Sequence, residues 1–110
     1  MLYGSTGSDS LDGGDGADEI QQTANVNQRL TNSLLTGQGS DTLLEIEQAV
    51  LTGGGGDNTL DASAFTLGPV TLDGSGGNDI LLGSAGNDSL IGGAGTDEIR
   101  QTVDLSLINI

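Results

Sequence analysis

The chain has 110 residues, sixteen of them acidic and only two basic, which gives a formal net charge of −14. It contains no cysteine, histidine or lysine, so disulfides, zinc sites, phosphate-binding loops and Ser-His or Cys-His nucleophiles are excluded. The charge argues against a nucleic-acid partner, because phosphates need clustered basic residues, and no apolar run is long enough to suggest membrane insertion. The partner that this composition favours is a cation.

Residues 4–21 form two glycine-rich nonapeptides, GSTGSDSLD and GGDGADEIQ. Both fit the pattern G-(G/S)-x-G-x-D-x-(L/I)-x. Glycine at positions 1, 2 and 4 permits positive φ and close backbone approach, so the glycine carbonyls can point into one concavity beside the Asp carboxylate. The three residues after the Asp predict a short strand with its middle side chain facing inward. Hard oxygen ligands of this kind suit Ca²⁺.

The middle stretch, residues 22–73, is richer in Thr, Leu, Ile and Val, and its apolar residues recur close to period two. This pattern predicts short strands separated by turns at Gly, Asn, Asp and Gly68-Pro69. On this interpretation Glu45 and Glu47 face solvent on a strand. A helix over 43–51 is a weaker alternative, because the segment lacks a capping pattern. Two degenerate nonapeptides lie within the stretch: TGQGSDTLL at 36–44, and GGGGDNTLD at 53–61, in which Asn58 replaces the Asp.

Residues 74–100 hold three further copies, GSGGNDILL, GSAGNDSLI and GGAGTDEIR. Two nonapeptides make one coil of strand, turn, strand and turn, so we expect turns that are two nonapeptides apart to stack on one edge. A longer repeat is also present, because Leu2–Thr23 and Leu81–Thr102 are identical at 15 of 22 positions. Residues 101–110 match the segment that begins at Gln22. We therefore expect residues 1–110 to be a single segment of a longer protein, ending inside the next repeat.

The stacked turns favour a metal-dependent fold. Neighbouring coils lie ~4.8 Å apart, so two stacked Asp carboxylates repel by about 3 kcal/mol at an effective dielectric constant near 20. A divalent cation between two turns reverses the sign of this interaction and satisfies the inward carbonyls. We expect the chain to be disordered without metal and folded with it.

The nonapeptides resemble the RTX, or haemolysin-type, calcium-binding repeat, whose pattern is G-G-x-G-x-D-x-U-x. The blocks at 4–21 and 74–100 carry this resemblance, and residues 22–73 are similar to the spacers between such blocks in large secreted bacterial repeat proteins. The resemblance implies an all-β fold, a right-handed parallel β-roll or β-helix, with Ca²⁺ held between turns by backbone carbonyls and the position-6 Asp. It also implies secretion, with folding outside the cell where calcium is high.

Mapped onto this sequence, the resemblance implies that Asp79 and Asp97 form the best complete site. Asp88 lies on the opposite edge between Gly68-Pro69-Val70 and Thr102-Val103-Asp104, so its site is expected to be incomplete. The other expected side-chain ligands are Asp9, Asp18, Asp41 and Asn58. The expected glycine ligands are Gly13, Gly14, Gly16, Gly74, Gly76, Gly77, Gly83, Gly86, Gly92, Gly93 and Gly95.

Two pairings stay open at the level of sequence. The separation of Asp41 and Asn58 falls one short of two nonapeptides, and they share an edge if the middle stretch continues the same coil with longer strands. Asp18 has no partner two nonapeptides further on, and the turn at Thr31-Asn32 is a poor candidate for one.

The function that these features indicate is a calcium-stiffened structural module without catalysis. Its partners are then Ca²⁺ and the adjacent repeats of the same chain, and end-to-end self-association is plausible because edge strands are otherwise uncovered. Two alternatives remain: an adhesin or surface-layer unit that self-assembles through its strand faces, and a C-terminal secretion and folding module of a larger enzyme.

Overall fold

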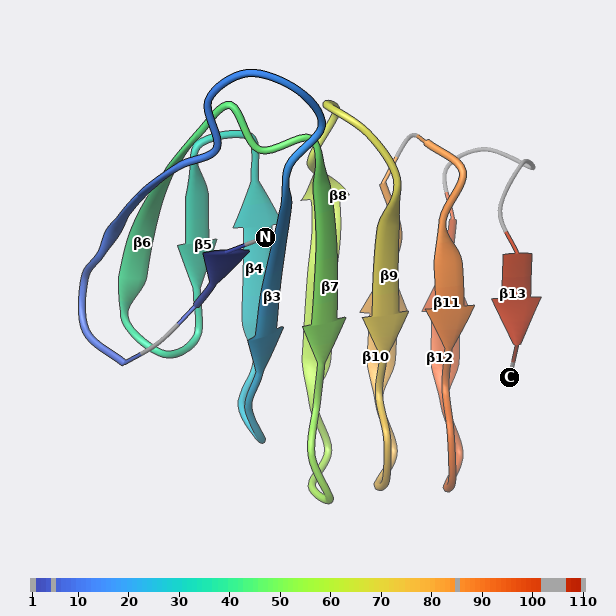
Figure 1. The fold of residues 1–110 in the computed structure, drawn as a ribbon. Helices are drawn as coiled ribbons and strands as arrows, with labels where there is room; N and C mark the ends of the chain where they lie inside the picture. The colour runs from blue at the N-terminus through green and yellow to red at the C-terminus, as the bar shows by residue number, and fades with distance from the viewer. Residues whose placement is uncertain (1, 5, 85, 102–106, 110) are drawn as a thin grey trace.

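The computed structural model describes residues 2–4, 6–84, 86–101 and 107–109, and all regular structure within them is β-strand (Figure 1). The strands are β1 (Leu2–Tyr3), β2 (Ser10–Asp12), β3 (Glu19–Thr23), β4 (Gln28–Thr31), β5 (Leu34–Thr36), β6 (Ser40–Leu44), β7 (Gln48–Thr52), β8 (Thr59–Ala64), β9 (Val70–Asp73), β10 (Ile80–Leu82), β11 (Ser89–Ile91), β12 (Glu98–Arg100) and β13 (Leu107–Asn109). The described chain therefore offers no long apolar helix that could span a membrane.

The strands form two sheets, and from β7 onward successive strands alternate between them (Figure 1). The first sheet has the order β1-β3-β7-β9-β11-β13 and is parallel throughout. The second has the order β12-β10-β8-β4-β5-β6-β2. The spacing of two nonapeptides predicted for the last block is confirmed, since Leu81 pairs with Ile99 and Leu72 with Leu90. The all-β class and the parallel pairing are likewise confirmed.

The core between the sheets is aliphatic and thin. Each strand turns alternate side chains inward, so a three-residue strand buries one residue, as Leu81 and Leu90 show with no exposed surface. Phe65 is the one aromatic residue buried in it among the described residues. The smallest extent of the molecule, 18 Å, fits two sheets packed about 10 Å apart with their outer side chains.

The middle stretch departs from the parallel pattern. The chain reverses at Asn32, and β5 pairs antiparallel with both β4 and β6. Asn32 is anchored to Thr66 by two hydrogen bonds of 2.7 and 2.8 Å, and the reversal lets Leu30 and Leu35 pair while both are fully buried. The second sheet thereby gains two strands, so the expectation of an entirely parallel roll is wrong between β4 and β6.

This reversal also decides one of the open pairings. Asn58 directly precedes β8 and Asp41 lies at the start of β6, but β4 and β5 stand between these strands. The two residues are therefore at the same end of one sheet without being neighbours. They share an edge, which the sequence had left open, but they do not form a pair of stacked turns.

Residues 45–47 form neither a strand nor a helix. They connect β6 to β7, with Ile46 fully buried and Glu45 in the left-handed region at a φ of 56°. The strand predicted for Glu45 and Glu47 is therefore wrong, although Glu45 is exposed as expected, and the weaker alternative of a helix over 43–51 is also not found. The expected repeat boundary near the C-terminus falls largely on residues 102–106 and 110, which lie outside the described residues.

Candidate metal centre

The glycine-Asp turns lie at two edges of the sheet pair. One edge, which we call the Asp79 edge, carries the turns at 4–9, 24–27, 37–39, 53–58, 74–79 and 92–97, and is the lower edge in Figure 1 for the turns that follow β7, β9 and β11. The other, the Asp18 edge, carries the turns at 13–18, 45–47, 65–69 and 83–88. Every sequence-predicted Asp lies at or beside the start of a strand on one of these edges.

Turn 74–79 lies directly on turn 92–97, as the spacing of two nonapeptides predicts. The Asp79 N–H donates to Asp97 Oδ1 at 2.9 Å, and the Asn58 N–H donates to Asp79 Oδ1 at 2.8 Å. Each position-6 side chain thus uses one oxygen to hold the backbone of the next turn. The result is a ladder of stacked turns along the Asp79 edge.

The second carboxylate oxygen of each Asp has no such donor. Asp79 Oδ2 and Asp97 Oδ2 are buried and accept no hydrogen bond. Asp79 Oδ2 lies against Gly74, where an added Cβ would overlap it and would stand 2.8 Å from the carbonyl oxygen of Gly92. The first glycine of the turn is therefore required for space. The positive φ that glycine permits occurs at positions 2 and 4 of these turns (Ser75, Gly77, Gly93 and Gly95), but not at position 1, Gly74 or Gly92.

The electrostatics of these oxygens favour a cation. Burial raises the pKa of Asp79, the hydrogen bond from the Asn58 N–H opposes this in part, and the neighbouring carboxylates of Asp97, Asp57 and Asp73 raise it further. A buried oxygen that lacks a donor and faces another oxygen is unfavourable unless positive charge lies between them.

Asp18 shows the same arrangement on the other edge. Its Oδ2 is buried without a donor and lies 2.7 Å from where a Cβ on Gly13 would stand. The carbonyl oxygen of Glu45, a residue with a left-handed φ, also lies against this Cβ position of Gly13. Glu47 Oε1 accepts the Asp18 N–H at 2.8 Å and so does for Asp18 what Asp97 does for Asp79. The candidate partner at Thr31-Asn32 is wrong, because Asn32 binds Thr66 instead.

Carboxylate and carbonyl oxygens are together the ligand set that Ca²⁺ takes in proteins. Within the described ranges no three Asp or Glu side chains converge on one point, so a cation here would draw its remaining ligands from the backbone. A family model of the RTX calcium-binding nonapeptide repeat matches residues 1–21, 50–65 and 71–100, in four copies. The chain belongs to this RTX family. No curated protein and no solved structure matched it.

One RTX turn pairs with a residue outside the matched ranges. The Asp9 N–H donates to Asp41 Oδ1 at 2.9 Å, while Asp41 Oδ2 is buried without a donor. Burial is the main cause that raises the pKa of Asp41. The partner of Asp9 is therefore Asp41, far along the chain, although the nonapeptide spacing predicts no partner for it.

Asn58 completes its turn without a metal. Its Nδ2 donates to the carbonyl of Gly56 at 2.9 Å and to Asn25 Oδ1 at 3.1 Å. This nitrogen stands 2.9 Å from the Cβ position of Gly53, the place that Asp79 Oδ2 takes beside Gly74. We call a buried side-chain oxygen without a hydrogen-bond donor an orphaned oxygen. At Asn58 an amide nitrogen thus replaces the orphaned oxygen of the Asp, so only the Asn58 side-chain oxygen could serve as a metal ligand.

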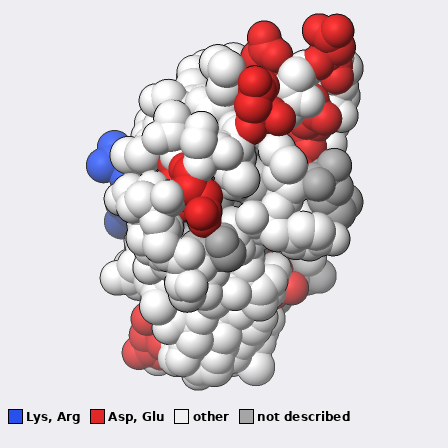
Figure 2. Space-filling view, turned by 60° about the vertical axis from the view of Figure 1, so that its left-hand side comes forward, with Lys and Arg blue, Asp and Glu red and all other residues white. Residues whose placement is uncertain are grey.

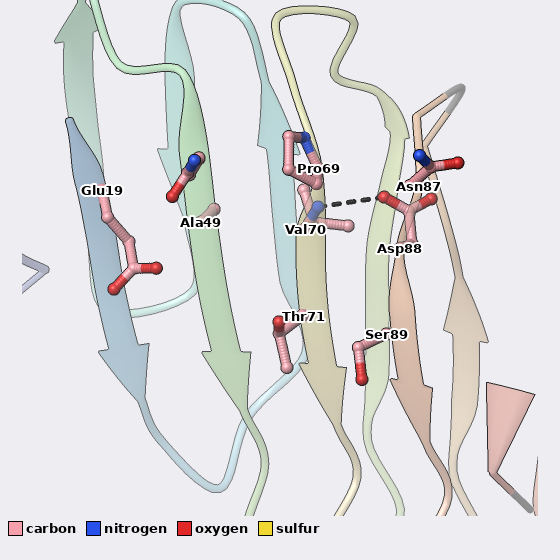
Figure 3. Close-up of a pocket in the computed structure, with 9 residues that line it drawn as sticks. Glu19, Ala49, Pro69, Val70, Thr71, Asn87, Asp88 and Ser89 are labelled. Atoms are coloured by element: carbon pink, nitrogen blue, oxygen red, sulfur yellow. Dashed lines mark hydrogen bonds between the residues drawn. The ribbon is translucent and has the colours of Figure 1, made fainter. Parts of the chain in front are cut away.

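Asp88 is also satisfied by the protein. Its Oδ1 accepts the Val70 N–H at 2.9 Å, drawn in Figure 3, and the Ser84 hydroxyl at 2.7 Å, while its Oδ2 accepts the Ser84 N–H at 2.9 Å. Val70 is the expected neighbour on one side, and the neighbour expected on the other, residues 102–104, lies outside the described residues. The surface hollow of about 390 Å³ beside Asp88 (Figure 3) is lined by none of the orphaned oxygens.

Sequence reasoning missed Glu45 and Glu47 as residues of this centre. The available signal was an acidic residue directly before a strand, since Glu47 precedes β7 as Asp79 precedes β10. The connection before Glu47's strand, residues 45–47, has three residues, whereas a nonapeptide turn has six. The longer side chain of Glu reaches across the difference.

Proposed function

We propose that this chain is a structural calcium-binding module that folds and stiffens when Ca²⁺ occupies its turns outside the cell. The observation that carries the proposal is that, among the described residues, four buried Asp oxygens have no donor: Asp18 Oδ2, Asp41 Oδ2, Asp79 Oδ2 and Asp97 Oδ2. Membership of the RTX family supports calcium as the ion. Bound Ca²⁺ neutralises the stacked carboxylates, and the chain itself supplies carboxylate and carbonyl ligands on rigid strand ends.

The residues that would hold the ion form two groups. Asp79 and Asp97, with the carbonyl of Gly92, serve the Asp79 edge, and Asp18 with the carbonyl of Glu45 serves the Asp18 edge. Asp88 contributes less because the Ser84 N–H and hydroxyl already donate to its two oxygens, and Asn58 contributes less because it has a donating amide nitrogen, bonded to the Gly56 carbonyl, in place of a second carboxylate oxygen. We propose no catalytic role, since the sequence contains no histidine or cysteine.

The proposed site of action is extracellular. RTX proteins are typically secreted, and weak sites with dissociation constants of about 10⁻⁴–10⁻³ M match calcium concentrations outside the cell. We further propose that the coil is right-handed, the hand of nearly all parallel crossover connections. A chain of this kind stays unfolded where calcium is scarce and folds after export.

A calcium titration followed by far-UV circular dichroism tests the proposal. In EGTA the β-sheet signal should be small, should rise cooperatively with Ca²⁺, and should not respond to equal concentrations of Mg²⁺, which demands tighter octahedral geometry. A full β-sheet signal in EGTA that millimolar Ca²⁺ leaves unchanged would show that calcium does not drive folding.

A further inference from the structure

Two orphaned oxygens do not belong to the RTX pattern. Gln22 Oε1 and Gln101 Oε1 are buried without a donor, and Gln22 as a whole is only 2% exposed. Each stands two nonapeptides after the first glycine of a G-S-x-G-x-D turn, Gly4 for Gln22 and Gly83 for Gln101. In the regular stack that place belongs to a glycine, because Gly92 stands two nonapeptides after Gly74.

The backbone confirms that turn 4–9 is stacked like turn 74–79. Three hydrogen bonds define the regular stack: Gly74 N–H to Ile91 O at 2.8 Å, Asp79 N–H to Asp97 Oδ1 at 2.9 Å, and Glu98 N–H to Asp79 O at 2.8 Å. Turn 4–9 repeats all three: Gly4 N–H to Gln21 O at 2.7 Å, Asp9 N–H to Asp41 Oδ1 at 2.9 Å, and Thr42 N–H to Asp9 O at 2.8 Å. Gln22 therefore takes the place of Gly92, and Asp41 takes the place of Asp97.

The oxygens that face the two turns also correspond. A Cβ on Gly74 would meet the backbone carbonyl oxygen of Gly92, and a Cβ on Gly4 would overlap the side-chain oxygen of Gln22. Asp41 Oδ2 is without a donor, like Asp97 Oδ2. Turn 4–9 is thus faced by one amide oxygen and one carboxylate oxygen, supplied by residues on either side of the excursion through β4 and β5.

Hydrogen bonds fix the orientation of the Gln22 amide. Its Nε2 donates to Gln28 Oε1 at 3.0 Å, and Gln28 Nε2 in turn donates to the carbonyls of Ala24 at 3.2 Å and Thr52 at 2.9 Å. Exchanging the nitrogen and oxygen of the Gln22 amide would set its oxygen against Gln28 Oε1, an acceptor against an acceptor. The oxygen, and not the nitrogen, must face Gly4.

We propose that Gln22 and Asp41 complete a calcium site on turn 4–9, a site split by the insertion of β4 and β5. Amide oxygens are ordinary Ca²⁺ ligands, and leaving one buried without a donor or a cation is costly. Gln101 shows the same arrangement on the Asp18 edge. Its Nε2 donates to Ser84 O, so its Oε1 faces Gly83, and both this oxygen and Asp88 Oδ2 lie close to the Cβ position of Gly83. This inference rests on the proposed function.

Terbium luminescence tests the split site selectively. Tyr3 is the only tyrosine, the chain has no tryptophan, and Tyr3 adjoins Gly4, so emission of Tb³⁺ excited through tyrosine reports on turn 4–9. Gln22→Met keeps the length of the side chain and removes the oxygen, and Asp41→Asn removes the charge. Each should weaken Tb³⁺ binding at this site by about 10- to 100-fold. The matched control is Gln21→Met, whose side chain hydrogen-bonds Glu19 Oε2 and should leave binding unchanged.

A second measurement uses the native chain and does not depend on a variant that folds. In the calcium-loaded protein the side-chain carbonyl carbon of Gln22 should shift downfield in the NMR spectrum relative to that of Gln28, which accepts only a hydrogen bond. Equal shifts, or unchanged Tb³⁺ affinity in folded Gln22→Met, would overturn the split site. Calcium bound elsewhere in equilibrium dialysis would then leave the proposed function standing, whereas no calcium bound by the native chain would overturn both.

Discussion

Asn58 and Asp79 occupy equivalent places in neighbouring turns, yet they differ in one atom. The Nδ2 of Asn58 donates to Gly56 O, whereas the Oδ2 of Asp79 is buried with no donor. A turn with Asn is therefore closed by its own amide, and a turn with Asp stays open for a cation. This single position decides which turns of the Asp79 edge depend on calcium.

Asn58→Asp should convert the closed turn into a calcium site. Until calcium fills the new site, the variant lacks two hydrogen bonds and buries a carboxylate beside Asp79, which should destabilise the fold by about 1–3 kcal/mol and raise the calcium concentration at which folding begins. With calcium, isothermal titration calorimetry should count one additional bound ion. Unchanged stoichiometry together with an unchanged calcium concentration for the onset of folding would contradict this role of the Asn58 amide.

Gly74→Ala tests the space beside Asp79 Oδ2. The added Cβ overlaps this oxygen and crowds Gly92 O, so calcium binding should weaken by about 1–3 kcal/mol, the usual cost of overpacking. Gly55→Ala is the matched control, because nothing lies within 4 Å of its Cβ position and its φ is not positive. Calorimetry should show weaker calcium binding for Gly74→Ala than for Gly55→Ala. Equal losses of calcium affinity would contradict a calcium site beside Asp79 Oδ2.

The strand elements divide into two classes by how their turns are closed. Around β4, β7 and β8, side-chain amides close the turns: Asn25 Oδ1 accepts the Gly56 N–H at 2.9 Å and Asn27 Oδ1 accepts the Thr59 N–H at 2.8 Å. Around β10 and β12, Asn78 Oδ1 likewise accepts the Thr96 N–H at 2.8 Å, but the buried Oδ2 atoms of Asp79 and Asp97 have no donor. The middle of the molecule should therefore hold together longer than the last block when calcium is removed.

Hydrogen exchange measured by NMR or mass spectrometry tests this order. On titration with EGTA, the amides of β10 and β12 should lose protection before those of β7 and β8. The reason is that the amide networks persist without metal, whereas the stacked carboxylates repel. Simultaneous loss of protection in all four strands would contradict two classes of turn.

The regular strands could be predicted from the sequence, and the reversal at Asn32 could not. Strands such as β10 to β12 follow from a nine-residue period in which each Leu or Ile stands two residues after an Asp or Asn. Residues 36–44 fit the same pattern and so suggested another parallel coil, while the pairing of Leu30 with Leu35 depends on tertiary burial that no local pattern encodes. Glu45 escaped because the insertion separates it from the turn at 13–18 that it faces. Gln22 stands at the regular spacing from Gly4, but the nonapeptide pattern gives no reason to expect a ligand from a glutamine side chain.

At the scale of the whole molecule, charge dominates. Sixteen acidic groups against two arginines repel one another in the compact state, and Figure 2 shows acidic side chains gathered at one end of the molecule. Arg100 donates to Glu98 at 3.2 Å, but this pair is exposed and contributes little. Cations and protons are therefore the two agents that can favour the folded chain.

The metal-free protein should become more stable as the pH falls from neutral. Burial raises the pKa values of Asp41 and Asp79 above 3.8 in the folded state, so the fold binds more protons than the unfolded chain. Their stabilising effect is fully present below the unfolded value and is lost as pH rises through the raised values. In EGTA the β-sheet signal in far-UV circular dichroism should grow toward acid pH, whereas in excess calcium the Tm should fall. A β-sheet signal in EGTA that shrinks on acidification would contradict this sign.

The calcium stoichiometry of Asp79→Asn with Asp97→Asn, compared with that of Asp12→Asn, tests most directly whether the orphaned carboxylates hold the calcium. The double variant places amides where the orphaned oxygens lie, whereas Asp12 is exposed and bonds only the local Gly14 N–H at 3.0 Å. Calorimetry should show fewer bound calcium ions and a smaller calcium-induced gain in Tm for the double variant, and native behaviour for Asp12→Asn. Full stoichiometry in the double variant, or an equal loss in Asp12→Asn, would contradict the claim that the orphaned carboxylates hold the calcium.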